Sequence, residues 1–253
     1  MTRKVRFGTL AAGALGALSL VACSTVKSAT GMAPDTSARI EPSRLSGLST
    51  AQLTEVNARR DALDQSRRTE QMASREAEDI AAKLKQAKSG HELAKAELKT
   101  ARQRAETATR EVPAGEEQRA AQEAELDPGT AEALEQNAER RVEYLEKLKG
   151  YVDARRRVSQ ELVSWQQARV DVASYEALER AKPKEARDLN INPRALTATM
   201  NDRQNSVANA RTEMEKKRGE ALVRYDSWWR GYNTLPEQRR GEVAPKVDDF
   251  KPL

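Results

Sequence analysis

A heptad pattern in the first half of this 253-residue chain constrains its fold more than any other feature. Between residues 77 and 112, small or apolar residues recur at alternating steps of three and four, inside a proline-free segment over 45–112. This is the a/d spacing of a coiled-coil seam, and its period predicts a left-handed supercoil with a closely packed partner helix. The seam consists of Ala77, Ile80, Leu84, Ala87, His91, Ala94, Leu98, Ala101, Ala105, Ala108 and Val112.

Proline and glycine divide the rest of the chain into further helices. We expect long helices over 45–112, 130–182 and 193–231, with a short acidic helical stretch over 116–126 between the first two. Thr130 is the expected N-cap of the second helix, and Asn192 caps the third, with proline at its first position. The pattern predicts an all-α fold, an elongated antiparallel helical hairpin or three-helix coiled-coil bundle over 45–232, followed by an irregular tail over 233–253.

Two residues in the first helix test this expectation. Gly90 lowers helix propensity by roughly 1 kcal/mol relative to alanine, but the seam passes through it in register, which favours a continuous helix. His91 is the single histidine and occupies an a position of the seam. A polar residue at one such position typically sets helix register, although a pH-sensing role or metal ligation is also conceivable.

The charge balance argues against nucleic-acid binding. The formal net charge is +5, but residues 1–22 carry Arg3, Lys4 and Arg6 and no acid, so their removal leaves +2. One histidine and one cysteine cannot build the usual nucleophilic or metal centres, and no phosphate-binding glycine loop is present. We therefore predict no enzyme activity, no catalytic or metal-ligating residues, no cofactor and no small-molecule substrate.

The N-terminus has the layout of a secretory signal segment, with a basic start followed by an uncharged run from Phe7 to Ala22. Its ending, Leu20-Val21-Ala22-Cys23, resembles the lipobox of bacterial lipoprotein precursors. That resemblance implies cleavage of residues 1–22 before Cys23 and acylation of the cysteine, which would anchor the protein to a membrane.

Three further expectations follow from this resemblance. Cys23 is the only cysteine, and lipidation would consume the thiol of an exported protein that has no disulfide partner for it. Residues 23–44, rich in small residues, would form a flexible tether. By analogy with enterobacterial sorting, Ser24 would direct the protein to the outer membrane, facing the periplasm, in a cell with two membranes; otherwise the protein stays on the outer face of the cell membrane.

The third helix ends in an aromatic group, Trp228, Trp229 and Tyr232. Packing within the helical body, a membrane-interface belt and a contact surface for a partner are the three interpretations. Packing is the default, with Trp165 and Tyr175 as the expected partners. Because adjacent residues on a helix point about 100° apart, Trp228 and Trp229 cannot both face the same seam.

These observations favour a structural function. The leading hypothesis is an envelope lipoprotein that acts as a spacer or scaffold, through contacts of a protein partner or a second copy with the helical seam. The alternative is an accessory subunit of an envelope machine for secretion, efflux or motility.

Overall fold

The computed structural model describes residues 39–110 and 127–237, and every long element in these ranges is a helix. The all-α class is therefore confirmed. The signal segment, Cys23, the expected helix over 116–126 and most of the tail lie outside the described residues. The elements are the short 3-10 helix η1 (Pro42–Leu45) and the helices α1 (Thr50–Arg110), α3 (Pro128–Ala181), α4 (Pro183–Asp188) and α5 (Pro193–Thr234).

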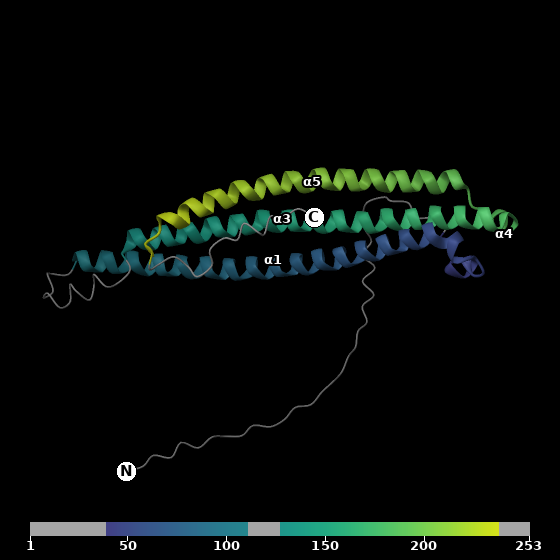
Figure 1. Ribbon diagram of the computed structural model, residues 1–253. Helices are drawn as coiled ribbons and strands as arrows, with labels where there is room; N and C mark the ends of the chain where they lie inside the picture. Colours follow the sequence, from purple (N-terminus) through teal and green to yellow (C-terminus); the bar gives the residue numbers. More distant parts are fainter. Residues whose placement is uncertain (1–38, 111–126, 238–253) are drawn as a thin grey trace, which may run out of the picture. The chain divides into compact units, whose positions relative to one another are not determined.

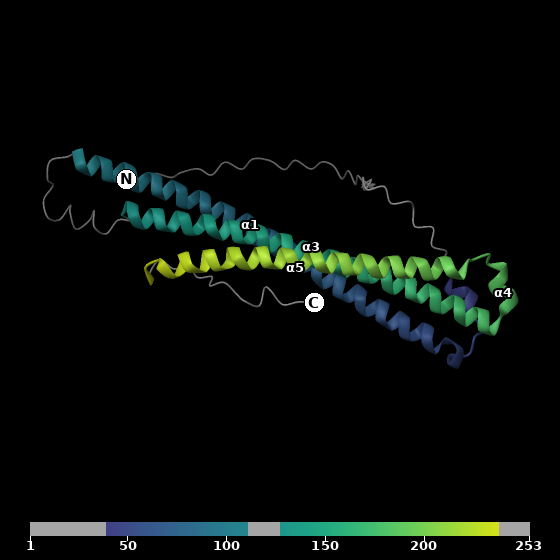
Figure 2. The same cartoon turned by 90° about the horizontal axis from the view of Figure 1, so that it is seen from above.

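Helix α3 lies between the other two long helices. It packs along α1 on one side and along α5 on the other, as two perpendicular views show (Figures 1 and 2). Ion pairs between helices show the relative directions of the helices. As the residue number of the α3 member increases, the residue number of its partner on α1 or α5 decreases. These pairs are Arg102–Glu132, Lys88–Glu146 and Arg155–Glu76 between α1 and α3, and Arg224–Glu143 and Lys147–Glu220 between α3 and α5. Both neighbours therefore run antiparallel to α3.

The seam of α1 faces α3. Each seam residue from Ala77 to Ala105 is buried or half-buried, whereas most residues between them are exposed. Gly90 lies inside the single helix α1, so the expected continuity at this position is confirmed. The side chain of Ala108 and all of Val112 lie outside the described residues.

Helix α3 buries two faces, where its sequence pattern suggested one. Leu145, Leu148 and Val152 belong to the expected stripe and are buried. Tyr144 and Tyr151 lie outside that stripe and are equally buried, because α1 and α5 cover different sides of α3. The irregular apolar spacing of this helix results from that double contact.

The helix ends differ from expectation at two places. The N-cap of α3 is Asp127, whose side chain accepts hydrogen bonds from the backbone amides of Gly129 and Thr130, so Thr130 as the cap was wrong. Pro128 occupies the first turn of the helix, where a backbone N–H has no partner within the helix and its absence is tolerated. The capping residue is therefore Asp127, directly before the proline. The link between α3 and α5 contains the additional helix α4, which buries Ala186.

The start of the body also differs from expectation. The segment over 23–44 was expected to be a tether, and the first helix to begin at residue 45. In the structure α1 begins at Thr50, and Ile40 and Leu45 are buried in an apolar cluster with Val56 and Leu178. Two large aliphatic side chains, Ile40 just before η1 and Leu45 at its end, explain why this part of the chain packs.

Candidate functional site

Trp228 lies inside the body, near the C-terminal end of α5. Its side chain stacks on Tyr144 of α3, with ring centroids 5.2 Å apart and planes inclined by 17°. Tyr225 meets Trp228 edge to face at 6.5 Å. Only 3% of Trp228 is exposed, so the structure places this residue in the core rather than on a contact surface.

The expectation that Trp165 and Tyr175 pack against the aromatic group of α5 was wrong. Tyr175 belongs to the apolar cluster around Ile40, whereas Trp228 belongs to the cluster that contains Tyr144. Trp165 has the guanidinium of Arg169 over its ring, at 4.8 Å from the centroid. The antiparallel direction is the physical reason, because it sets the end of α5 beside the beginning of α3.

Polar groups fix the position of the Trp228 ring. Its indole Nε1 donates to Asn137 Oδ1 at 3.3 Å, and Asn137 Nδ2 donates to the Trp228 carbonyl oxygen at 3.4 Å. The guanidinium of Arg141 lies 5.8 Å from the ring centroid, and burial lowers the pKa of Arg141. Sequence inspection missed Asn137 and Tyr144. Because α3 and α5 are antiparallel, the distance of Trp228 from the turn between them, counted in residues, points to this part of α3.

Trp229 and Tyr232 lie at the surface of the same helix. Their rings stack on one another, with centroids 5.5 Å apart and an interplanar angle of 10°, and both residues are half-buried. Trp228 therefore points inward and Trp229 outward, as adjacent helical residues must. Near this part of α5 there is an open hollow, lined by Val223, Asp226, Ser227 and Arg230 of α5 and by Arg140 of α3.

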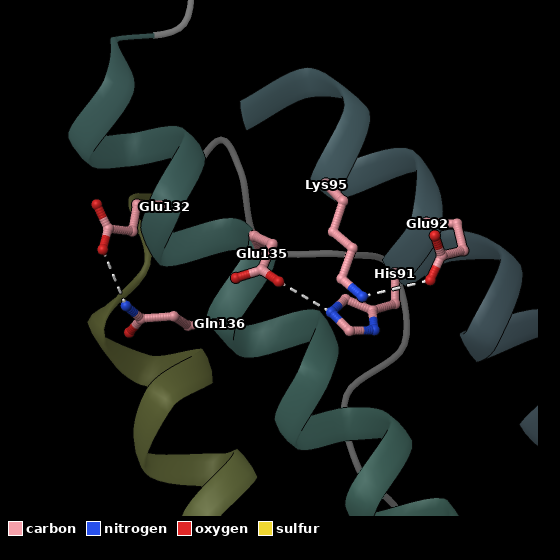
Figure 3. Close-up of polar contacts among 6 residues, drawn as sticks. All are labelled: His91, Glu92, Lys95, Glu132, Glu135 and Gln136. Atoms are coloured by element: carbon pink, nitrogen blue, oxygen red, sulfur yellow. Dashed lines mark hydrogen bonds and ion pairs between the residues drawn. The ribbon is translucent and has the colours of Figure 1, made fainter. Parts of the chain in front are cut away.

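His91 contacts α3 as its seam position requires. Its Nε2 lies 3.0 Å from Glu135 Oε1, and 11% and 16% of the two side chains are exposed (Figure 3). Beside this contact, two further residues of α1 pair with one another, Lys95 with Glu92 at 3.4 Å (Figure 3). The geometry suits a polar pair that specifies how α1 sits on α3.

Charged residues from three helices surround the buried Tyr151. Arg155 of α3 pairs with Glu76 of α1 at 2.8 Å, and Arg218 of α5 pairs with Glu215 at 3.4 Å. Burial raises the pKa of Tyr151, while the two guanidinium groups act in the opposite direction. This is a packed ionic arrangement within the body.

Several features bear on chemistry and on comparison with known proteins. Within residues 39–110 and 127–237, no group of three or more acidic, histidine or cysteine side chains is placed to hold a metal ion. No helix in the same ranges combines the length and apolar character needed to cross a membrane.

No protein-family model, curated protein or solved structure matches the chain.

Proposed function

We propose that this protein is an exported lipoprotein, anchored through Cys23, whose helical body acts as a structural spacer or scaffold in the cell envelope. The sequence Leu20-Val21-Ala22-Cys23 and the single cysteine support the anchor. The extended pairing of α3 with two antiparallel neighbours supports the scaffold and is the observation on which the proposal rests.

Helix length gives the body its reach. Helix α1 has 61 residues, α3 has 54 and α5 has 42. At 1.5 Å per residue, these helices are about 90, 80 and 60 Å long. Because α3 pairs with both neighbours along tens of residues, each helix is supported over most of its length.

We further propose that α1 and α3 form a coiled coil. The buried and half-buried positions of α1 between Ala77 and Ala105 follow the 3.5-residue spacing. The alanine column allows close approach, and the His91–Glu135 pair supplies the polar contact that commonly fixes register.

A partner would use an outer face of this body. The α1 seam is covered by α3 within one chain, so it is not free for a second helix unless α1 separates. The stacked Trp229 and Tyr232 on α5 are the better contact surface, since interfaces are enriched in aromatic residues.

Replacing Cys23 tests the anchor. In a bacterial host, a Cys23→Ser variant should remain an uncleaved precursor and take up no labelled fatty acid. A Ser28→Ala variant, which leaves the lipobox intact, should be processed and labelled normally. Release of a normally processed form from the Cys23→Ser variant would contradict the anchor.

The scaffold role is tested by crosslinking in intact cells. A photocrosslinking residue at Trp229 should capture a partner, whereas the same residue at the exposed Met72 on α1 should not. Capture of several subunits of one large membrane assembly would favour the accessory role over a scaffold. Equal capture from both positions would argue against a specific surface on α5.

A further inference from the structure

One end of the helical body is formed by the turn between α3 and α5, with the helical residues on either side of it, and by the segment that leads into α1. We call this the basal end and define it as residues 39–53 and 178–196. Ile40 and Leu45 are buried there against Leu178 and Leu196. The Lys182 ammonium group donates to the Ser46 carbonyl oxygen at 3.4 Å, which joins the two segments.

The basal end is positively charged. It carries four acidic residues, Glu41, Glu179, Glu185 and Asp188. Its basic residues number seven, of which Lys182 is half-buried and the others are exposed: Arg39, Arg44, Arg180, Lys182, Lys184, Arg187 and Arg194. The net charge of +3 exceeds the +2 of the whole chain after residue 22.

The described residues of the opposite end carry no net charge. Residues 100–110, 127–141 and 224–237 contain seven basic and seven acidic residues. Along α1 these two ends are separated by about 90 Å, which is many times the screening length at physiological salt. Each end therefore acts on its surroundings independently.

We infer that the basal end docks on the anionic phospholipid headgroups of the membrane that holds the Cys23 lipid. This inference rests on the proposed anchor. Ile40 follows Cys23 by seventeen residues, which span at most about 60 Å even when fully extended. The cations at the basal end are therefore within reach of the bilayer, whereas the far end of α1 lies about 90 Å further along the helix.

Electrostatics favours one orientation. Basic side chains near an anionic leaflet are attracted to it, and acidic ones are repelled. The basal end should therefore face the headgroups, because the opposite end has no net positive charge to compete with it. The attraction acts within a Debye length of the surface, about 8 Å at physiological salt, so the contact is salt-sensitive.

The test uses the lipidated mature chain in vesicles that carry an acceptor-labelled lipid. A donor dye is attached through Ala51→Cys at the basal end or through Gln103→Cys near the other end of α1; both positions are exposed. With phosphatidylcholine containing about 30% phosphatidylglycerol, we expect at least about twofold more energy transfer from the basal dye. In pure phosphatidylcholine, and in high salt, the difference should shrink.

Matched charge reversals give the control. The double variant Lys184→Glu and Arg187→Glu should abolish the preference, while Lys85→Glu with Lys99→Glu, an equal change of charge on α1, should keep it. Equal transfer from both dyes in anionic and neutral vesicles would overturn the inference. Failure of the proposed anchor is a separate result, because the chain would then not float with pure phosphatidylcholine vesicles at all.

Discussion

Asn137 of α3 and Trp228 of α5 are joined by two hydrogen bonds, one in each direction. The amide oxygen accepts from the indole nitrogen, and the amide nitrogen donates to the backbone of the same tryptophan. A buried donor without a partner costs about 1–3 kcal/mol, so the pair disfavours any sliding of α5 along α3. Together with the Tyr144 stack, it fixes one register for these two helices.

Replacing the two adjacent tryptophans should give different losses of stability. Trp228→Ala removes a ring that is 3% exposed and should lower the free energy of unfolding by about 3–5 kcal/mol. Trp229→Ala removes a half-buried ring and should cost much less. Denaturant unfolding followed by circular dichroism measures both changes, and equal losses would contradict the assignment of Trp228 to the core.

Alanine should have opposite effects at two helical glycines. At Gly231 a Cβ atom would lie 2.5 Å from the flexible end of Arg140 and 3.2 Å from Asn137 Nδ2. Because two hydrogen bonds hold Asn137 to Trp228, Gly231→Ala should be destabilising. Nothing lies within 4 Å of a Cβ at Gly219, so Gly219→Ala should stabilise the helix by up to about 1 kcal/mol.

The reason for the Gly231 effect can be checked with a second change. Adding Arg140→Ala to the Gly231→Ala variant removes only the contact with the flexible side chain, so it should recover little of the lost stability. Thermal unfolding of the single and double variants is the measurement. A double variant that recovers most of the lost stability would show that Arg140, and not Asn137, is the cause.

The His91–Glu135 pair should be stabilising only as a pair. His91→Leu leaves the carboxylate of Glu135, which is 16% exposed, without its partner and should cost about 1–3 kcal/mol. Changing both residues to leucine should recover this loss, because an apolar pair suits a buried seam. Glu92→Gln, at an exposed pair with Lys95, should change stability by less than about 0.5 kcal/mol.

Acid should weaken the N-terminus of α3 through Asp127. Hydrogen bonds from the Thr130 hydroxyl and from the amides of Thr130 and Gly129 lower the pKa of Asp127 below its usual 3.8. Because the folded pKa lies below the unfolded one, this stabilisation is present above the unfolded value and is lost as pH falls through the folded value.

The pH dependence can be isolated with one variant. Asp127→Asn keeps a capping side chain that does not titrate, so the stability difference between it and the natural protein should change between about pH 5 and about pH 2. Chemical unfolding across that range gives the difference. A constant difference would show that Asp127 does not gain from its capping hydrogen bonds.

Sequence patterns predicted α1 best because this helix has one long partner. Its seam from Ala77 to Ala105 can be read as a single period, and Gly90 does not interrupt it. Helix α3 was harder, since two partners bury two stripes and Tyr144 and Tyr151 then break the apparent spacing. Trp228 was recognised as a candidate core residue, but its partners depend on the register of two antiparallel helices, which no local pattern contains.

The shared position of α3 has a consequence for any shortened chain. Helices α1 and α3 can pair without α5, which leaves the side of α3 that meets Met214 and Trp228 uncovered. A nascent chain that stops before Pro193 would display Tyr144 and Tyr151 to proteases and chaperones. Premature termination before α5 is complete should therefore remove the whole protein from the cell, not only its final helix.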